Sequence, residues 1–214
     1  MRKLLITALL LFTTILLQAQ FRVGPRFGYN QSTTTRSQGG ITVSEVYGFQ
    51  GGVSMLIGGQ MAFQPEILYM QKGMRIDTSK NASYVKFTNN YLAVPLLLNF
   101  SFGKQRVRFF FNFGPYVAYW LDGKVESMVD GRKIEYDYVF DENLDDDGIK
   151  DHRFDYGFCG GVGVRFQLGK GYIVVDGRLD YGFDDITTVK EGGASYISTR
   201  NRTVSGSIAY LFYF

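Results

Sequence analysis

The residues best suited to catalysis lie next to each other at positions 151 and 152. His152 is the only histidine of the 214 residues, and it follows Asp151. A histidine beside a carboxylate can activate water or a serine hydroxyl, provided that the nucleophile is held within hydrogen-bond reach. Ser195 and Ser198 lie far along the chain, and no spacing fixes their distance from the histidine. We therefore expect no enzymatic activity, and a hydrolase that uses His152 is the least favoured hypothesis.

A strongly acidic stretch precedes this histidine. Residues 122–151 hold 11 of the 20 acidic residues of the chain and four basic ones. Oxygen ligands at alternate positions, followed by a glycine, are typical of the first half of a calcium loop. The candidate ligands are Asn143, Asp145, Asp147 and Asp151, but the twelfth position, which should be glutamate, is Phe154. The stretch predicts a solvated acidic surface loop without a resident cofactor; loose Ca²⁺ binding, or repulsion or bridging with surface polyanions, is the alternative.

The composition excludes several other classes. A single cysteine, Cys159, cannot form an internal disulfide, and 45% apolar residues are too many for a disordered chain. A formal charge of +3 is too small to indicate a nucleic-acid partner. Beyond residue 20, no apolar run approaches the ~18 residues of a spanning helix.

The first residues have the pattern of an export signal. Arg2 and Lys3 precede an apolar stretch at 4–17, and Ala19 offers a small residue at a cleavage point. We expect residues 1–19 to be a cleavable signal peptide and residues 20–214 to form one exported domain. A membrane anchor is the alternative.

The exported part shows the period-two alternation of β-strands. In each of eight segments, apolar side chains occupy one face and polar or small ones the other. The segments are 21–30, 47–57, 61–69, 92–100, 107–121, 154–168, 173–183 and 204–214. No apolar face carries a charged residue, whereas the opposite faces carry nine: Arg22, Arg26, Glu66, Arg108, Asp155, Arg165, Asp176, Arg178 and Asp180.

This distribution favours a membrane barrel over a soluble sandwich. Arginine or lysine on a lipid face costs roughly 2–4 kcal/mol at mid-bilayer, so charge is confined to the lumen. An eight-stranded lumen is just wide enough to be filled by side chains. We expect the charges to pair there, with a proton or ion path as the alternative; candidate pairs are Glu66 with Arg26 or Arg108, and Asp176 or Asp180 with Arg165 or Arg178.

The connections between the segments alternate between long and short. The gaps 31–46, 70–91, 122–153 and 184–203 are long, whereas those near 58–60, 101–106 and 169–171 are tight. Closure is required because lipid leaves no unpaired strand edge. The sequence therefore predicts an all-β, eight-stranded antiparallel up-and-down transmembrane β-barrel with both termini on the short-turn, periplasmic side. Pro65, Pro95 and Pro115 lie inside these segments and predict local bulges.

Several of these segments resemble one known family. QPEILY at 64–69, YLAVPLLL at 91–98, GPY at 114–116, DYG at 155–157, GGVG at 160–163 and YLFYF at 210–214 are similar to the PorT-like family of bacterial outer-membrane β-barrel proteins. The resemblance covers essentially the whole exported chain. It implies an outer-membrane location in contact with lipid, and a role in a type IX-like secretion or envelope complex.

The last residues resemble the signal that the barrel-insertion machinery reads. Ile208, Tyr210, Phe212 and Phe214 alternate up to the end of the chain. The leading hypothesis is a non-enzymatic outer-membrane component that anchors partners through its loops or turns. A surface-binding or adhesion barrel that uses the acidic loop is the alternative.

Overall fold

The computed structural model describes residues 20–35, 42–78, 83–104, 106–129, 131–140, 149–183, 187–191, 195–197 and 200–213. Eight long strands dominate it: β1 (Phe21–Thr35), β2 (Thr42–Gly58), β3 (Met61–Thr78), β4 (Ser83–Lys104), β5 (Val107–Val129), β8 (Phe154–Leu168), β9 (Gly171–Gly182) and β12 (Arg200–Tyr213). Four short strands are β6 (Arg132–Asp137), β7 (Ile149–Asp151), β10 (Thr187–Glu191) and β11 (Ser195–Ile197). The described residues include no helical segment that could span a bilayer.

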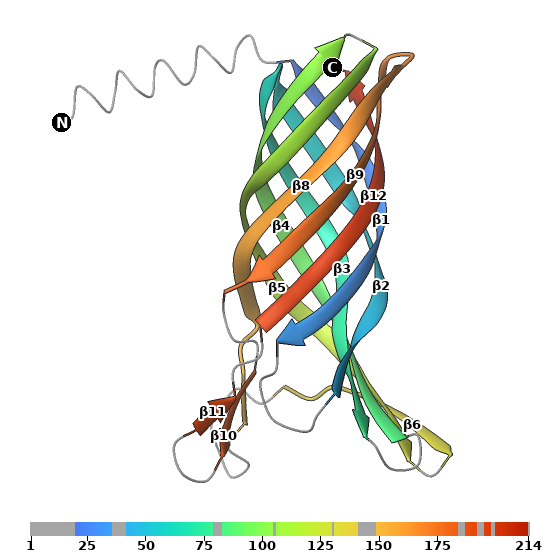
Figure 1. Ribbon diagram of the computed structural model, residues 1–214, viewed down its shortest axis with the longest axis vertical. Helices are drawn as coiled ribbons and strands as arrows, with labels where there is room; N and C mark the ends of the chain where they lie inside the picture. The colour runs from blue at the N-terminus through green and yellow to red at the C-terminus, as the bar shows by residue number, and fades with distance from the viewer. Residues whose placement is uncertain are drawn as a thin grey trace, which may run out of the picture.

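The long strands close into a barrel (Figure 1). Each pairs antiparallel with its neighbours in the order β1–β2–β3–β4–β5–β8–β9–β12, and β12 pairs with β1 to complete the ring. Strand β6 adds to the edge of β5, and β11, β10 and β7 form a separate small sheet. Figure 1 shows β6, β10 and β11 at the end opposite the C-terminus. We call the end that carries β6, β10 and β11 the long-loop end, and the opposite end, where the C-terminus lies, the short-turn end.

Apolar side chains point outward and charged ones point inward, as the alternation in the sequence predicts. Phe27 is 62% exposed and Tyr29 is 60% exposed on the outer wall, whereas Arg22 and Arg26 on the opposite face of the same strand are each 1% exposed. The same alternation holds along the other long strands, so the apolar faces cover the outside and the charges lie within. The prediction of an eight-stranded antiparallel barrel is confirmed.

Tight turns at the short-turn end depend on glycine. Gly58, the last residue of β2, has a φ of 127°, and Gly169 between β8 and β9 has a φ of 57°. Side chains with a Cβ rarely adopt these angles, so glycine allows the chain to reverse within a few residues.

Two details of the prediction were wrong. Strands β1 to β5 and β12 run beyond the predicted segments into the gaps at the long-loop end, whereas β8 and β9 do not. As a result, β4 and β5 have 22 and 23 residues, about twice what a bilayer crossing needs. Pro65, Pro95 and Pro115 cause no shift of register. The register shifts instead between Glu45 and Gln50 on β2 and between Asn90 and Tyr91 on β4. On an outward-facing position, a missing N–H is tolerated without a bulge where the pairs on either side keep the ladder aligned.

The barrel interior contains apolar clusters as well as charge. Toward the short-turn end lie Leu56, Ala62, Phe110, Tyr172, Val174, Ala209 and Leu211. Toward the long-loop end, Trp120 and Tyr91 stack with their ring centroids 6.0 Å apart, and Leu68, Met70, Leu97 and Cys159 pack in the same cluster. These clusters support the charged groups that lie between and beside them.

Candidate functional site

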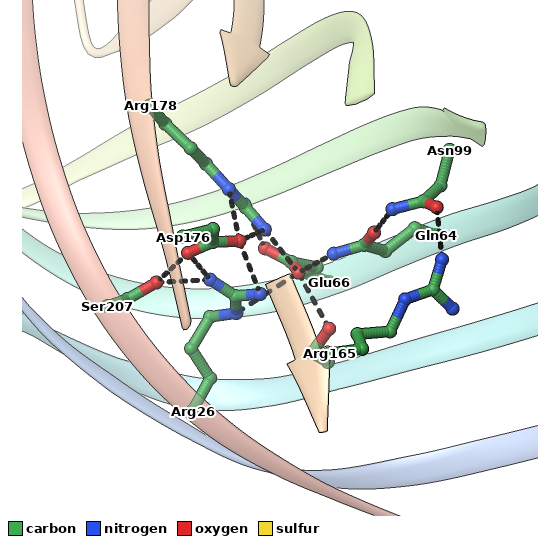
Figure 2. A network of polar contacts seen from close by, with 9 residues as sticks. Arg26, Gln64, Glu66, Asn99, Arg165, Asp176, Arg178 and Ser207 are labelled. Atoms are coloured by element: carbon green, nitrogen blue, oxygen red, sulfur yellow. Dashed lines mark hydrogen bonds and ion pairs between the residues drawn. The ribbon is translucent and has the colours of Figure 1, made fainter. Parts of the chain in front are cut away.

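Four charged side chains meet inside the barrel (Figure 2). We call Arg26, Glu66, Asp176 and Arg178 the central network. Each is at most 5% exposed. Two cations alternate with two anions, so the formal charge of the group is zero.

The ion pairs of the central network are short and partly bidentate. Arg178 donates to Glu66 at 2.6 Å to Oε2 and 3.0 Å to Oε1, and to Asp176 Oδ2 at 2.9 Å. Arg26 donates to Asp176 at 2.7 and 3.0 Å, and its Nε lies 3.2 Å from Glu66 Oε1. Charge-assisted pairs of this kind offset the large cost of removing ions from water.

The pair between Glu66 and Arg178 crosses the lumen. Glu66 lies on β3 and Arg178 on β9, and these strands are four places apart in either direction around the ring of eight. A direct contact between opposite walls occupies the centre of the barrel at this level. The central network therefore fills the lumen where a pore would need open space.

Neutral polar groups extend the central network toward the short-turn end. Gln64 donates to Glu66 Oε1 at 2.7 Å, Asn99 donates to Gln64 at 2.7 Å, and Arg165 donates to Asn99 at 2.7 Å. Ser54 also donates to Glu66 at 2.6 Å, and Ser207 hydrogen-bonds both Arg26 and Asp176. Figure 2 shows these links running from β12 across to β4.

A second buried ion pair lies toward the long-loop end. Lys72 Nζ is 3.1 Å from Asp155 Oδ2, and both side chains are at most 1% exposed. Tyr116 donates to Asp155 at 3.2 Å and Asn201 donates to it at 2.9 Å. Lys72 also lies over the ring of Tyr116, 4.7 Å from its centroid. This arrangement satisfies the carboxylate with three donors.

Sequence reasoning missed Lys72. The predicted segment ended at Tyr69, where the outward apolar residues stop, but β3 continues to Thr78. Counting the inward positions onward from Glu66 in steps of two would have reached Lys72 and could have found it.

Three predicted lumen charges have other surroundings than expected. Arg108 does not contact Glu66: it lies one residue into β5, at the short-turn end, whereas Glu66 lies five residues into β3. Arg165 donates to Asn99 and not to an acid. Asp180 is half-buried opposite Cys159 on β8, and among the described residues it forms no ion pair. Charges pair only at the same height in the barrel, which alternation alone does not give.

The remaining predicted residues are only partly covered by the structure. Asn143, Asp145 and Asp147 lie outside the described residues, and Asp151 ends β7. Among the residues that the structure does describe, no three His, Cys, Asp or Glu side chains gather as metal ligands would. His152 is half-buried between β7 and β8; Ser195 begins β11, and Ser198 is outside the described residues.

The C-terminal alternation lies on the outer wall of β12. Ile208 and Phe212 are exposed, Tyr210 is half-buried, and Phe214 is outside the described residues. Tyr210 donates to the carbonyl of Leu168 at 2.9 Å across the short-turn end. That the barrel-insertion machinery recognises this C-terminal strand stays a prediction.

A closed ring of strands, with an apolar outer wall and ionised groups crossing the lumen, defines a membrane-spanning β-barrel. The chain belongs to the family described as outer membrane protein beta-barrel domain, because the model of that family matches residues 18–188. The family places the chain in the outer membrane.

The solved structure of OprG agrees on the fold, and two other solved structures show a weaker similarity. OprG of Pseudomonas aeruginosa is 12% identical, with 92% of this chain and 96% of that chain covered and a TM-score of 0.56. Ail, the attachment invasion locus protein of Yersinia pestis, is 13% identical over 90% of this chain and 99% of that one, with a TM-score of 0.43. AlkL is 14% identical over 91% and 92%, with a TM-score of 0.45. None of the curated proteins compared with this chain matches it.

Proposed function

We propose that this protein is a non-conducting, non-enzymatic outer-membrane anchor that presents a protein-docking sheet at its long-loop end. The observation that carries the proposal is the contact between Glu66 and Arg178 across the lumen. A barrel crossed by a buried, doubly hydrogen-bonded ion pair does not offer a diffusion path for solutes. Its use then depends on the surfaces that it holds outside the bilayer.

The docking sheet is formed by the extensions of β4 and β5 with β6. Among the residues that the structure describes, strand β6 pairs only with β5, so its other edge has no partner within them, and all six of its side chains are exposed. Ile134 and Tyr136 are 57% and 54% exposed, and nearby Val139 is 86% exposed. Strand edges of this kind are templates for pairing with another chain, and exposed apolar side chains favour a protein partner.

Ion pairs and hydrogen bonds make this sheet an ordered projection. Lys133 Nζ lies 3.0 Å from Glu126, and Lys124 Nζ lies 3.3 Å from Glu135, in each case between β5 and β6. The Tyr84 hydroxyl donates to Glu126 at 2.5 Å, and this hydrogen bond lowers the pKa of Glu126 below its ordinary value. A preordered edge strand loses less entropy on binding than a loop does.

The resemblance to the PorT-like family suggests the context of this docking. Under the proposal, the short-turn end and both termini face the periplasm, the insertion machinery reads the C-terminal strand, and the sheet binds a partner in a secretion or envelope complex of the type IX kind. The long strand extensions, which all lie at the end opposite the termini, support this orientation.

Surface binding or adhesion is the second candidate. Strand β6 lies within the acidic stretch 122–151, so the same exposed sheet could bind a surface outside the cell instead of an envelope protein. The two candidates share the site and differ in the partner.

Site-specific crosslinking in intact cells separates them. A photoreactive amino acid at Ile134 or Tyr136 should give one discrete adduct with an envelope protein, whereas one at the lipid-facing Phe111 should give none. Adducts that form only when a second cell or surface is added would favour adhesion. Equal adducts from all three positions would refute a docking sheet, and ion conductance of the purified protein in planar bilayers would refute a filled lumen. Unchanged behaviour of a His152→Ala variant in peptide- and ester-hydrolysis assays would support the absence of a rim hydrolase.

A further inference from the structure

The short-turn end of the barrel is cationic without any acidic residue. Residues 20–22, 58–61, 101–109, 165–171 and 211–213, which make up its rim and innermost turns, contain six basic residues and no aspartate or glutamate. The six are Arg22, Lys104, Arg106, Arg108, Arg165 and Lys170. The nearest lumen carboxylates, Glu66 and Asp176, already pair with Arg26 and Arg178.

Three of these arginines belong to the lumen wall. Arg108 of β5 and Arg165 of β8 are direct cross-strand partners, and Arg22 projects inward from β1 on the opposite side of the ring from β5. The charges of Arg22 and Arg108 both act on Arg165. Like charges that face each other across strands destabilise a sheet. This placement therefore needs a compensating interaction.

Neutral groups inside the barrel supply only part of that compensation. Arg165 donates to Asn99 and lies 5.1 Å from the ring centroid of Phe110. Arg22 donates to the Gly58 carbonyl at 3.1 Å and to Gln20, and lies over Tyr172 and Tyr213 at 5.4 and 4.9 Å. Arg22 and Arg165 are 1% and 2% exposed.

One donor of each of the three guanidinium groups has no acceptor among the described residues. Within the described residues, the buried Nε atoms of Arg22, Arg108 and Arg165 have no hydrogen-bond partner, and none of the three side chains forms an ion pair. A buried charge without a counter-ion is costly, and adding an anion is the direct way to remove that cost. Arg26 Nε also has no hydrogen-bond partner, but both arginines of the central network contact two carboxylates, so what distinguishes the other three arginines is the lack of an ion pair among the described residues.

An open surface hollow reaches Arg108 of this group. The hollow has a volume of about 990 Å³, lies at the β4–β5 turn, and is lined by Gln60, Lys104, Arg106 and the half-buried Arg108 together with the outward-facing Val107 and Phe109. Lys104 and Arg106 are exposed at its rim, and Arg165 lies beside Arg108 on the next strand. An incoming group would meet the two exposed cations first and Arg108 behind them.

We propose that the short-turn mouth of the barrel is an oxyanion-binding site, with Arg108 as the contacting residue and Arg22 and Arg165 as the buried positive charge beneath it. Its ligands are phosphate or carboxylate groups, whose oxygens fit the guanidinium fork. The site is independent of the sheet at the long-loop end and does not rest on what docks there. The phosphate group could come from a free solute or from an anionic phospholipid headgroup at the rim.

The test uses the full exported chain in nanodiscs of phosphatidylcholine. Inorganic pyrophosphate is titrated while binding is measured by calorimetry and thermal unfolding. We expect saturable binding that raises the unfolding temperature, and an apparent Kd about tenfold weaker in Arg108→Gln, because one charge-assisted hydrogen-bond pair is lost. Lys170→Gln is the matched control: it removes the same charge from the same end of the barrel, on another turn, and should change the Kd less than about twofold.

A second readout separates binding from a structural role. Without anion, Arg108→Gln relieves repulsion from Arg165, so this variant should unfold at a higher temperature than the parent, whereas a structural arginine would give a lower one. Stabilisation by phosphatidylglycerol nanodiscs but not by pyrophosphate, lost in Arg108→Gln, would support the same site with a lipid as the source. No response to either anion, or equal losses in Arg108→Gln and Lys170→Gln, would overturn the proposal.

Discussion

Replacing Glu66 with glutamine tests the central network most directly. The carboxylate accepts hydrogen bonds from Arg178, Ser54 and Gln64, lies 3.2 Å from Arg26 Nε, and its side chain is 0% exposed. Glutamine keeps the size but removes the charge. Arg26 and Arg178 would then share Asp176 alone, leaving one net positive charge inside the barrel.

The expected cost follows from this imbalance. Removing one partner of a buried ion pair destabilises a protein by about 3–5 kcal/mol, because the remaining charge is uncompensated. We expect Glu66→Gln to lower the free energy of unfolding by about 3 kcal/mol, the lower end of that range, since Asp176 still contacts both arginines. Urea unfolding from lipid vesicles, followed by the fluorescence of the sole tryptophan, measures the change.

Two comparisons make the test specific. Glu135→Gln removes the same charge from an ion pair whose side chains are 48% and 60% exposed, and should cost less than about 0.5 kcal/mol. Glu66→Gln combined with Arg178→Gln should cost less than the two single changes together, by about 1–3 kcal/mol. A loss below about 1 kcal/mol for Glu66→Gln, or strict additivity in the double variant, would refute the reasoning on buried ion pairs.

Three further predictions use other parts of the barrel. Phe111→Arg places a cation on the outer wall, at a position 43% exposed to lipid, and should cost about 2–4 kcal/mol in the same unfolding assay; a neutral outcome would contradict the lipid-facing assignment. Cys159, 1% exposed, should resist a membrane-permeant maleimide until the barrel is unfolded, and rapid labelling of the folded protein would show an open lumen. Hydrogen bonding from Tyr84 lowers the pKa of Glu126, so its stabilisation of the β5–β6 hairpin is present above the ordinary glutamate pKa and is lost as the pH falls through the lowered one. Amide exchange of the hairpin should show this loss, and Tyr84→Phe should reduce it.

The barrel itself could be predicted because lipid imposes the same rule on every spanning residue. Phe27 and Tyr29 face acyl chains, and Arg26 and Asn30 face the lumen. No charge is tolerated on the lipid-facing side. Period-two alternation in which one face lacks charged residues is therefore a strong signal of a membrane barrel. Closure then follows from the need to pair every backbone group.

The strand ends could not be predicted because this rule stops at the membrane surface. Beyond Leu121 on β5, charged residues such as Lys124 and Glu126 enter the strand. One continuous apolar face therefore no longer marks the strand in the sequence. Strand β6 likewise carries exposed side chains at every position. What holds these extensions in strand conformation is pairing between β4, β5 and β6, which depends on residues distant in sequence.

Which charged residues pair inside the lumen could not be predicted, because pairing depends on the position of each residue along the barrel axis. Alternation placed Arg108, Arg165 and Glu66 on the same wall, and sequence reasoning treated them as free to pair. The ladder puts Arg108 opposite Arg165 and puts Glu66 opposite Ser54, farther from the turns. These heights follow from turn positions and strand tilt, which a single sequence does not state.

The central network and the outer wall specify the same strand register by independent means. A slip of one residue between β2 and β3 would turn Glu66 toward lipid and Ile67 toward the lumen, exchanging a buried ion pair for a charge in hydrocarbon. A slip of two residues keeps every face correct, so the apolar wall does not oppose it. It would, however, move Glu66 out of reach of both Ser54 and Arg178, whose contacts are at 2.6 Å. Lipid-facing side chains therefore fix which face is outside, and cross-lumen ion pairs fix the remaining choice, which is the height of each strand in the ring.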